Sequence, residues 1–150
     1  MEAITINGKT YTPEFNYGFF KNLRKELNTN NPIDQLLSGL ADNDPETLIT
    51  MVHTGLMSQA NTPSKEDVAN GMDELFAEMK DDELFRDAVK ELQKSGFLLA
   101  MTKRWMKSSE RMLKASKEVL ENVSEKEQAQ AEMELAQVDN IVKTVKKYLK

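Results

Sequence analysis

Polar and hydrophobic residues alternate, as in β-strands, over one short stretch near the start of the chain, ITINGKTYT at residues 4–12. The Asn-Gly pair at its centre is the strongest short-range signal for a hairpin, because both turn positions require a positive φ. This turn would pair Ile4 with Tyr11 and Ile6 with Lys9, which leaves one face apolar. A two-stranded hairpin is marginal alone in water, so we expect the rest of the protein to cover that face.

From residue 13 onward, apolar residues recur at spacings of three and four, which is typical of amphipathic helices. Each of the four prolines follows a residue that can cap a helix, and proline is favoured in the first helical turn. The pattern predicts helices that begin near residues 13, 32, 45 and 63 and a fifth that begins after a cap at Asp81 or Asp82. Ser95-Gly96 is typical of a helix end. The first three helices should end near residues 27, 40 and 60.

The first helix carries a wide apolar stripe, formed by Phe15, Phe19, Phe20, Leu23 and Leu27. We expect this stripe, through Phe15, Phe19 and Leu23, to cover the apolar face of the hairpin, since it follows directly in the chain. Two longer helices end the chain: one over residues 97–122, and one that begins at SEKE, a capping box at residues 124–127.

The predicted fold is therefore mainly α, with a short N-terminal β-hairpin packed on a multi-helix bundle and a long C-terminal helical hairpin. We divide the chain into an N-terminal domain of hairpin plus helices, residues 1–96, and a C-terminal helical hairpin extension, residues 97–150.

Composition and charge narrow the class of protein. The chain has no cysteine, which excludes disulfide scaffolds, thiol nucleophiles and cysteine zinc sites. Its net charge is −5, divided as −3 over residues 1–60, −5 over 61–95 and +3 over 96–150. Solvated helix faces are the simpler explanation, and head-to-tail contact between copies or an acidic partner is the alternative. The N-terminus lacks the features of a signal peptide and no apolar run is long enough to span a membrane, so we expect a cytoplasmic protein.

Sequence motifs of catalysis are missing. The six glycines form no phosphate-binding loop, and the one histidine, His53, has no cysteine or nucleophile motif beside it. Asp81, Asp82 and Glu83 lack the alternating ligands of a calcium loop, so capping explains them better. We predict that the protein is not an enzyme and uses no cofactor or metal.

Candidate binding residues lie on the first of the two long helices. Methionine adapts to varied apolar partners, and Met101, Trp105, Met106 and Met112 are our candidates for contact with another protein. Lysine and arginine around Trp105 allow the alternative that this region contacts nucleic acid, which the acidic net charge disfavours.

Candidate residues for self-association lie on the hairpin. Thr5 and Thr10 occupy its polar face beside the strand edges, and unpaired strand edges can join the sheet of another copy.

The order of these elements resembles that of the tail assembly chaperones of long-tailed phages and prophages of Gram-positive bacteria. The resemblance begins with ITINGKTYTPEFNYGFFKNLRKEL, continues through LLSGLADNDPETL and LITMVHTGLMSQ, and ends with TPSKEDVANGMDEL, which together cover about residues 4–80.

The resemblance implies a non-enzymatic protein that coats the tape measure protein, keeps it soluble and helps to recruit tail-tube subunits. Several copies, as a homo-oligomer or side by side on the partner, would act in the host cytoplasm and be absent from the mature virion. The alternative from the residues alone is a small helical regulator or adaptor whose basic C-terminal helices contact nucleic acid.

Overall fold

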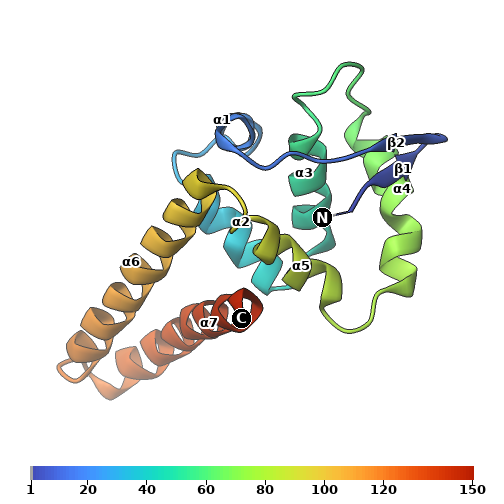
Figure 1. Ribbon diagram of the computed structural model, residues 1–150. Helices are drawn as coiled ribbons and strands as arrows, with labels where there is room; N and C mark the ends of the chain where they lie inside the picture. Colours follow the sequence, from blue (N-terminus) through green and yellow to red (C-terminus); the bar gives the residue numbers. More distant parts are fainter. Residues whose placement is uncertain (1) are drawn as a thin grey trace.

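The computed structural model describes residues 2–150, which form a short hairpin followed by helices (Figure 1). The mainly α prediction is confirmed. The strands and helices are β1 (Ile4–Ile6), β2 (Lys9–Tyr11), α1 (Tyr17–Glu26), α2 (Pro32–Ala41), α3 (Pro45–Gly55), α4 (Lys65–Glu78), α5 (Glu83–Glu91), α6 (Gly96–Leu120) and α7 (Glu125–Leu149).

The N-terminal hairpin has the predicted turn and register. Asn7 and Gly8 have φ values of 51° and 77°, as a type I′ turn requires. The antiparallel strands pair Ile4 with Tyr11, Thr5 with Thr10 and Ile6 with Lys9. Ile4, Ile6 and Tyr11 are buried, so the alternation of the sequence predicted the inward face correctly.

The prediction that the first helix covers the hairpin is wrong. Strand β1 packs on α4, whereas α1 packs on α2, α3 and α6. Figure 1 shows the hairpin lying across α4 on the opposite side of the body from α1. The cause is Gly71 of α4, where the missing side chain lets Ile6 and the backbone of Thr5 approach the helix closely.

Two predicted helix starts at prolines are also wrong. Helix α1 begins four residues after Pro13, because Asn16 caps it by accepting a hydrogen bond from the N–H of Phe19 at 3.1 Å. The backbone N–H of Glu14 donates a hydrogen bond to the carbonyl oxygen of Gly55 at 2.8 Å, and this bond holds the segment before α1 against the end of α3. Helix α4 begins two residues after its proline, with Ser64 as the cap.

The remaining differences concern helix ends. Helix α3 stops at Gly55, five residues earlier than predicted. The prediction of a stop at residues 95–96 is wrong, because Ser95 accepts a hydrogen bond from the N–H of Leu98 at 3.4 Å and so begins α6. Helix α7 starts after Ser124 as predicted, although the serine side chain makes no capping bond.

Helix α2 lies at the centre of the core. It is only ten residues long, yet it contacts α1, α3, α5, α6 and α7. Its buried side chains are Pro32, Ile33, Leu36, Leu37 and Leu40. The surrounding helices therefore bury one apolar stripe each, while α2 is apolar on most of its surface.

Helices α6 and α7 form a long antiparallel hairpin that projects from the body, with its tip at residues 121–124 (Figure 1). The C-terminal part of α7 returns to the body and contacts α2 and α5. Val142, Val145 and Tyr148 are buried there, and the hydroxyl of Tyr148 donates a hydrogen bond to Oδ1 of Asn43 at 2.9 Å. The division of the chain at residue 96 stays a prediction.

Candidate functional site

The four candidate binding residues of α6 differ in exposure. Trp105 is buried, and its indole Nε1–H donates a hydrogen bond to Oδ1 of Asp34 at 2.8 Å, which ties α6 to α2. Met101 and Met106 are half-buried against the same core. Met112 is 56% exposed and is the one that reaches an open surface. A role for any of the four in binding a partner stays a prediction.

The two threonines of the hairpin lie opposite each other and are exposed. In a hairpin with a two-residue turn, Ile6 and Lys9 form the hydrogen-bonded pair, so the backbone groups of Thr5 and Thr10 face outward. A methyl group on Gly71 would lie 3.1 Å from the carbonyl oxygen of Thr5, which shows that α4 covers this edge. Pairing with another copy through the β2 edge at Thr10 stays a prediction.

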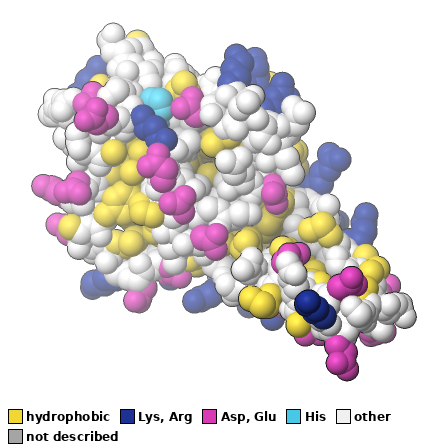
Figure 2. Space-filling view, turned by 180° about the vertical axis from the view of Figure 1, so that it is seen from behind, with side chains coloured by type: hydrophobic (Ala, Val, Ile, Leu, Met, Phe, Trp, Pro, Cys, Tyr) yellow, Lys and Arg dark blue, Asp and Glu magenta, His cyan; other side chains and the backbone are white. Residues whose placement is uncertain are grey.

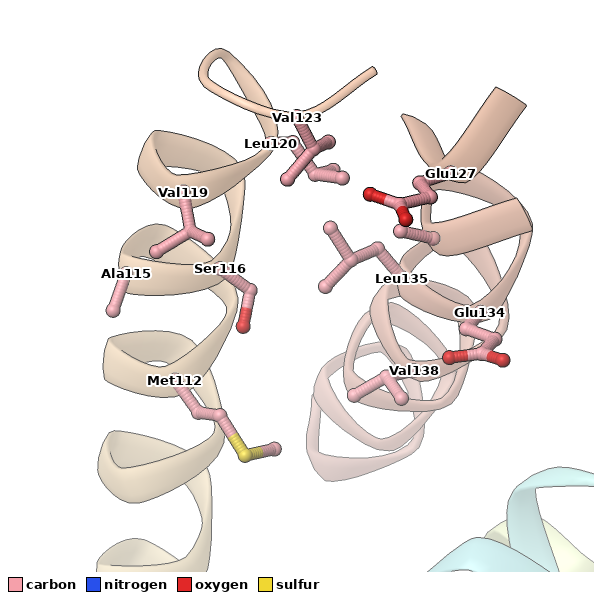
Figure 3. A pocket seen from close by; sticks show the side chains of 11 residues that line it. Met112, Ala115, Ser116, Val119, Leu120, Val123, Glu127, Glu134, Leu135 and Val138 are labelled. Carbon is pink, nitrogen blue, oxygen red and sulfur yellow. The ribbon is translucent and has the colours of Figure 1, made fainter. Parts of the chain in front are cut away.

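Met112 belongs to an apolar groove on one face of the α6–α7 hairpin (Figure 3). We call it the tip groove; its volume is about 520 Å³. Figure 3 shows Met112 and Val138 at the end toward the body, and Val123 and Glu127 at the end toward the tip. The lining residues are Met112, Ala115, Ser116, Val119, Leu120, Val123, Glu127, Ala131, Glu134, Leu135 and Val138.

The other face of the same hairpin carries more charged side chains, beside Leu120 and Leu135, which both faces share. The hollow there includes Lys117, Glu121 and Asp139 among its lining residues. The ammonium group of Lys143 lies 2.9 Å from Asp139, and its hydrogen bond holds the pKa of that carboxyl below its usual range. The two faces of the hairpin thus differ in the number of charged side chains that line them, and both are open to solvent.

A second groove lies on the body, between the hairpin, α3, α4 and α5. We call it the body groove; its volume is about 660 Å³. Apolar side chains from four elements line it: Ile4, Leu48, Met72, Leu75, Met79 and Leu84. Carboxylates are placed among them: Glu2, Glu78, Glu83, Asp87 and Glu91, with Lys90 and Lys94 beside them. Figure 2 shows hydrophobic side chains gathered between α3 and α4, with acidic side chains around them.

Sequence reasoning missed the body groove as a site. Met72, Leu75 and Met79 recur at the spacing of a buried helix stripe, but Leu75 is 38% exposed and Met79 is only half-buried. Periodicity identifies the apolar face of one helix and does not reveal that a neighbouring element fails to cover it. The local signal was the excess of ten acidic over five basic residues in 61–95.

His53 is the one histidine of the chain. It is half-buried on α3, and within residues 2–150 its buried Nδ1 atom has no hydrogen-bond partner. In the part of the chain that the structure describes, no helix is both long and apolar enough to cross a membrane.

A family model described as phage tail assembly chaperone protein, TAC, matches residues 3–107. The chain belongs to the phage tail assembly chaperone family. A family of chaperones is not a family of enzymes. Comparison with curated proteins found no match, and neither did comparison with solved structures.

Of the two grooves of this tail assembly chaperone, the matched range includes the body groove and not the tip groove. It includes the hairpin and α1 to α5, and therefore the whole lining of the body groove except Glu2. The tip groove begins at Met112, beyond the end of the match. The body groove thus lies almost entirely within the residues that match the family.

Proposed function

We propose that this tail assembly chaperone holds helical segments of the tape measure protein in the body groove and keeps that protein soluble during tail assembly. On this proposal it acts in the host cytoplasm, helps to recruit tail-tube subunits and leaves before the virion is mature. The observation that carries the proposal is the body groove itself, an apolar surface with an acidic rim inside the range that matches the family.

The chemistry of the groove specifies its occupant. An amphipathic helix presents an apolar stripe between two polar flanks, and such a helix can lie in an apolar groove with a charged rim. Carboxylates of Glu78, Glu83 and Asp87 beside the apolar floor favour a helix whose flanks carry lysine or arginine. Met72 and Met79 have flexible side chains that can adjust to different apolar residues, so one groove accepts successive segments of a long helix.

Reversibility follows from the size of the site. A groove of about 660 Å³ binds only a few side chains of a partner, so each contact is weak. Many copies along one tape measure chain would hold it through the sum of their contacts. Tail-tube subunits that bind the same stripe could then displace the copies one at a time.

Coexpression of the chaperone with the tape measure protein of the same genome tests the proposal. The wild-type protein should keep the partner soluble and copurify with it, while Leu75→Glu should lose both effects because it places a charge on the groove floor. Met57→Glu is the matched control: Met57 and Leu75 are both 38% exposed, but Met57 lies outside the groove.

Rescue of the partner by Leu75→Glu as efficient as by wild type would refute the body groove as the site. Absence of rescue by the wild-type protein would refute the function. Retardation of DNA or RNA that weakens with added salt would then support the regulator alternative instead.

A further inference from the structure

Three aromatic rings form one continuous surface where α1 meets the start of α6 (Figure 1). The ring centroid of Phe97 lies 5.1 Å from that of Tyr17 and 5.2 Å from that of Phe20, and the rings of Tyr17 and Phe20 stack at 6.4 Å. Tyr17 is still 56% exposed and Phe97 36% exposed. We call these three rings the aromatic patch; it is an apolar surface that another molecule can cover.

Basic side chains flank the aromatic patch. Lys21 and Arg24 each lie four residues after a ring of α1, and Arg104 lies on the same face of α6 as the ring at its start. All three are exposed, and in the described part of the chain none of them forms an ion pair. Residues 15–25 and 96–109 contain no acidic residue, although the net charge of the chain is −5. The patch is therefore locally positive.

The body groove has the complementary character. Its lining holds five carboxylates and two lysines, which is a net charge of −3, around an apolar floor. Its chemistry specifies an apolar helix face with basic flanks as the occupant, and α1 with the start of α6 presents such a face. We propose that the aromatic patch of one copy of the chain binds the body groove of a second copy.

The contact uses two different surfaces, so it joins copies head to tail. The aromatic rings of one copy cover Leu75 and Met79 of the other, which are only partly buried in the single chain. The basic flanks meet the carboxylates of the rim. The net charge of −5 opposes the approach of a nucleic acid to the patch, whereas the body groove supplies acidic and apolar groups together.

This inference rests on the body groove of the proposed function, because the same groove would hold the tape measure protein. Copies in excess of that partner would cover one another's grooves. Helices of the tape measure protein would then compete with the aromatic patch for the groove, so self-association should decrease when the partner is present. The contact would keep the apolar groove covered until a partner arrives.

Sedimentation velocity of the full-length protein tests the contact. The average mass of the wild-type protein should rise with concentration and fall with added salt. Arg24→Glu should weaken the association about tenfold, because it turns an attraction to the rim into a repulsion. Lys25→Glu is the matched control: both side chains are exposed in the last turn of α1, and Lys25 lies about 100° further around the helix. This control should associate as the wild type does.

A mixture of two blocked variants gives a sharper test. The variant Lys21→Glu, Arg24→Glu blocks the patch, and Leu75→Lys blocks the groove with a charge of the same sign as the patch, so each should be monomeric alone. Mixed, they should form a dimer and nothing larger, because one intact patch meets one intact groove.

Met57→Lys is the control for the groove variant. Met57 and Leu75 are both 38% exposed, but Met57 does not line the groove, so Met57→Lys should associate as the wild type does. Circular dichroism should show unchanged helix content in every variant, because the substituted side chains are exposed in the single chain.

Three results would overturn the proposal. The first is a wild-type protein that is monomeric at all concentrations, and the second is a variant Lys21→Glu, Arg24→Glu that associates as the wild type does. The third is a mixture of the two blocked variants that remains monomeric. Binding of single-stranded RNA that the patch variant loses, without self-association of the wild type, would assign the patch to nucleic acid instead.

Coexpression with the tape measure protein separates this inference from the proposed function. A wild-type protein that is monomeric and still keeps the tape measure protein soluble would refute only the head-to-tail contact. Head-to-tail association without rescue of the tape measure protein would refute only the function.

Discussion

Gly71 is the position where the packing of the hairpin can be tested most directly. A methyl group there would lie 2.8 Å from Cγ1 of Ile6 and 3.1 Å from the backbone oxygen of Thr5. Both distances are shorter than ordinary van der Waals contact, so in Gly71→Ala the hairpin must shift away from α4. The same change favours the helix, because alanine is about 1 kcal/mol better than glycine in a helix interior.

The balance of these two effects decides the sign. Inserting a methyl group into a well-packed site costs about 1–3 kcal/mol. Here the cost should be about 2 kcal/mol, above the lower limit of that range, because Ile6 is buried and cannot swing into solvent, and the second contact is with backbone. We therefore expect Gly71→Ala to lower the free energy of unfolding by about 1 kcal/mol. For a chain of this length the melting temperature should fall by about 2–4 °C.

Urea and thermal unfolding of four variants would measure this. Gly96→Ala is the matched control: Gly96 begins α6, and a methyl group there meets nothing within 4 Å, so it should not destabilise the protein. Ile6→Ala removes the Cγ1 atom and leaves space for the new methyl group. The double variant Ile6→Ala, Gly71→Ala should therefore be about 1 kcal/mol more stable than the sum of the single effects.

The reasoning is refuted if Gly71→Ala raises the melting temperature, since helix propensity would then act without an opposing contact. Strict additivity of the two changes would refute the contact between Ile6 and Gly71.

Two further predictions concern partly buried hydrogen bonds that join distant helices. Burial and the neighbouring carboxylate of Asp82 raise the pKa of Tyr148 to about 12, whereas an unfolded tyrosine ionises near pH 10. The tyrosine of the unfolded chain therefore loses its proton at lower pH than the folded one. The free energy of unfolding should fall between pH 10 and 12 by on the order of 2 kcal/mol. In alkaline urea titrations, Tyr148→Phe should lack this part of the pH dependence. Trp105→Phe removes the bond to Asp34 and should cost about 1–2 kcal/mol in urea at pH 7, and a free energy unchanged within error would show that this bond contributes nothing.

Local features of the sequence were enough to predict the hairpin and the number of helices. The Asn7-Gly8 turn determines the strand register by its backbone geometry alone, so no information from distant residues is needed. Asp44 shows the same for a helix start: it precedes a proline and caps α3 by accepting a hydrogen bond from the N–H of Glu46 at 3.2 Å.

Predictions failed where two local signals competed or where contact depended on distant residues. Thr12-Pro13 and Asn16 are both possible starts of α1, and the structure uses Asn16 because Glu14 is already bonded to Gly55. The choice of α4 as the partner of the hairpin depends on a glycine 65 positions after Ile6. Hydrophobic periodicity carries no information about which of several apolar helix faces will meet.

The candidate site illustrates the same limit. Methionine content directed attention to α6, and the structure separates buried Trp105 from exposed Met112 on the same helix. Both side chains occupy apolar positions in the sequence, and what differs is the neighbour. Near Trp105, α6 contacts the body through Asp34 of α2, whereas Met112 lies on the part of α6 that projects beyond the body.

The end of the family match within α6 has a structural consequence. The matched residues 3–107 do not include α7, yet Val142, Val145 and Tyr148 of α7 are buried against the body, where α7 contacts α2 and α5. A chain that ended at residue 107 would expose the faces of α2 and α5 that these side chains cover. The body groove needs α5 in place, because Leu84 and Asp87 line it. The returning end of α7 therefore supports the groove from behind, even though its own sequence lies outside the family match.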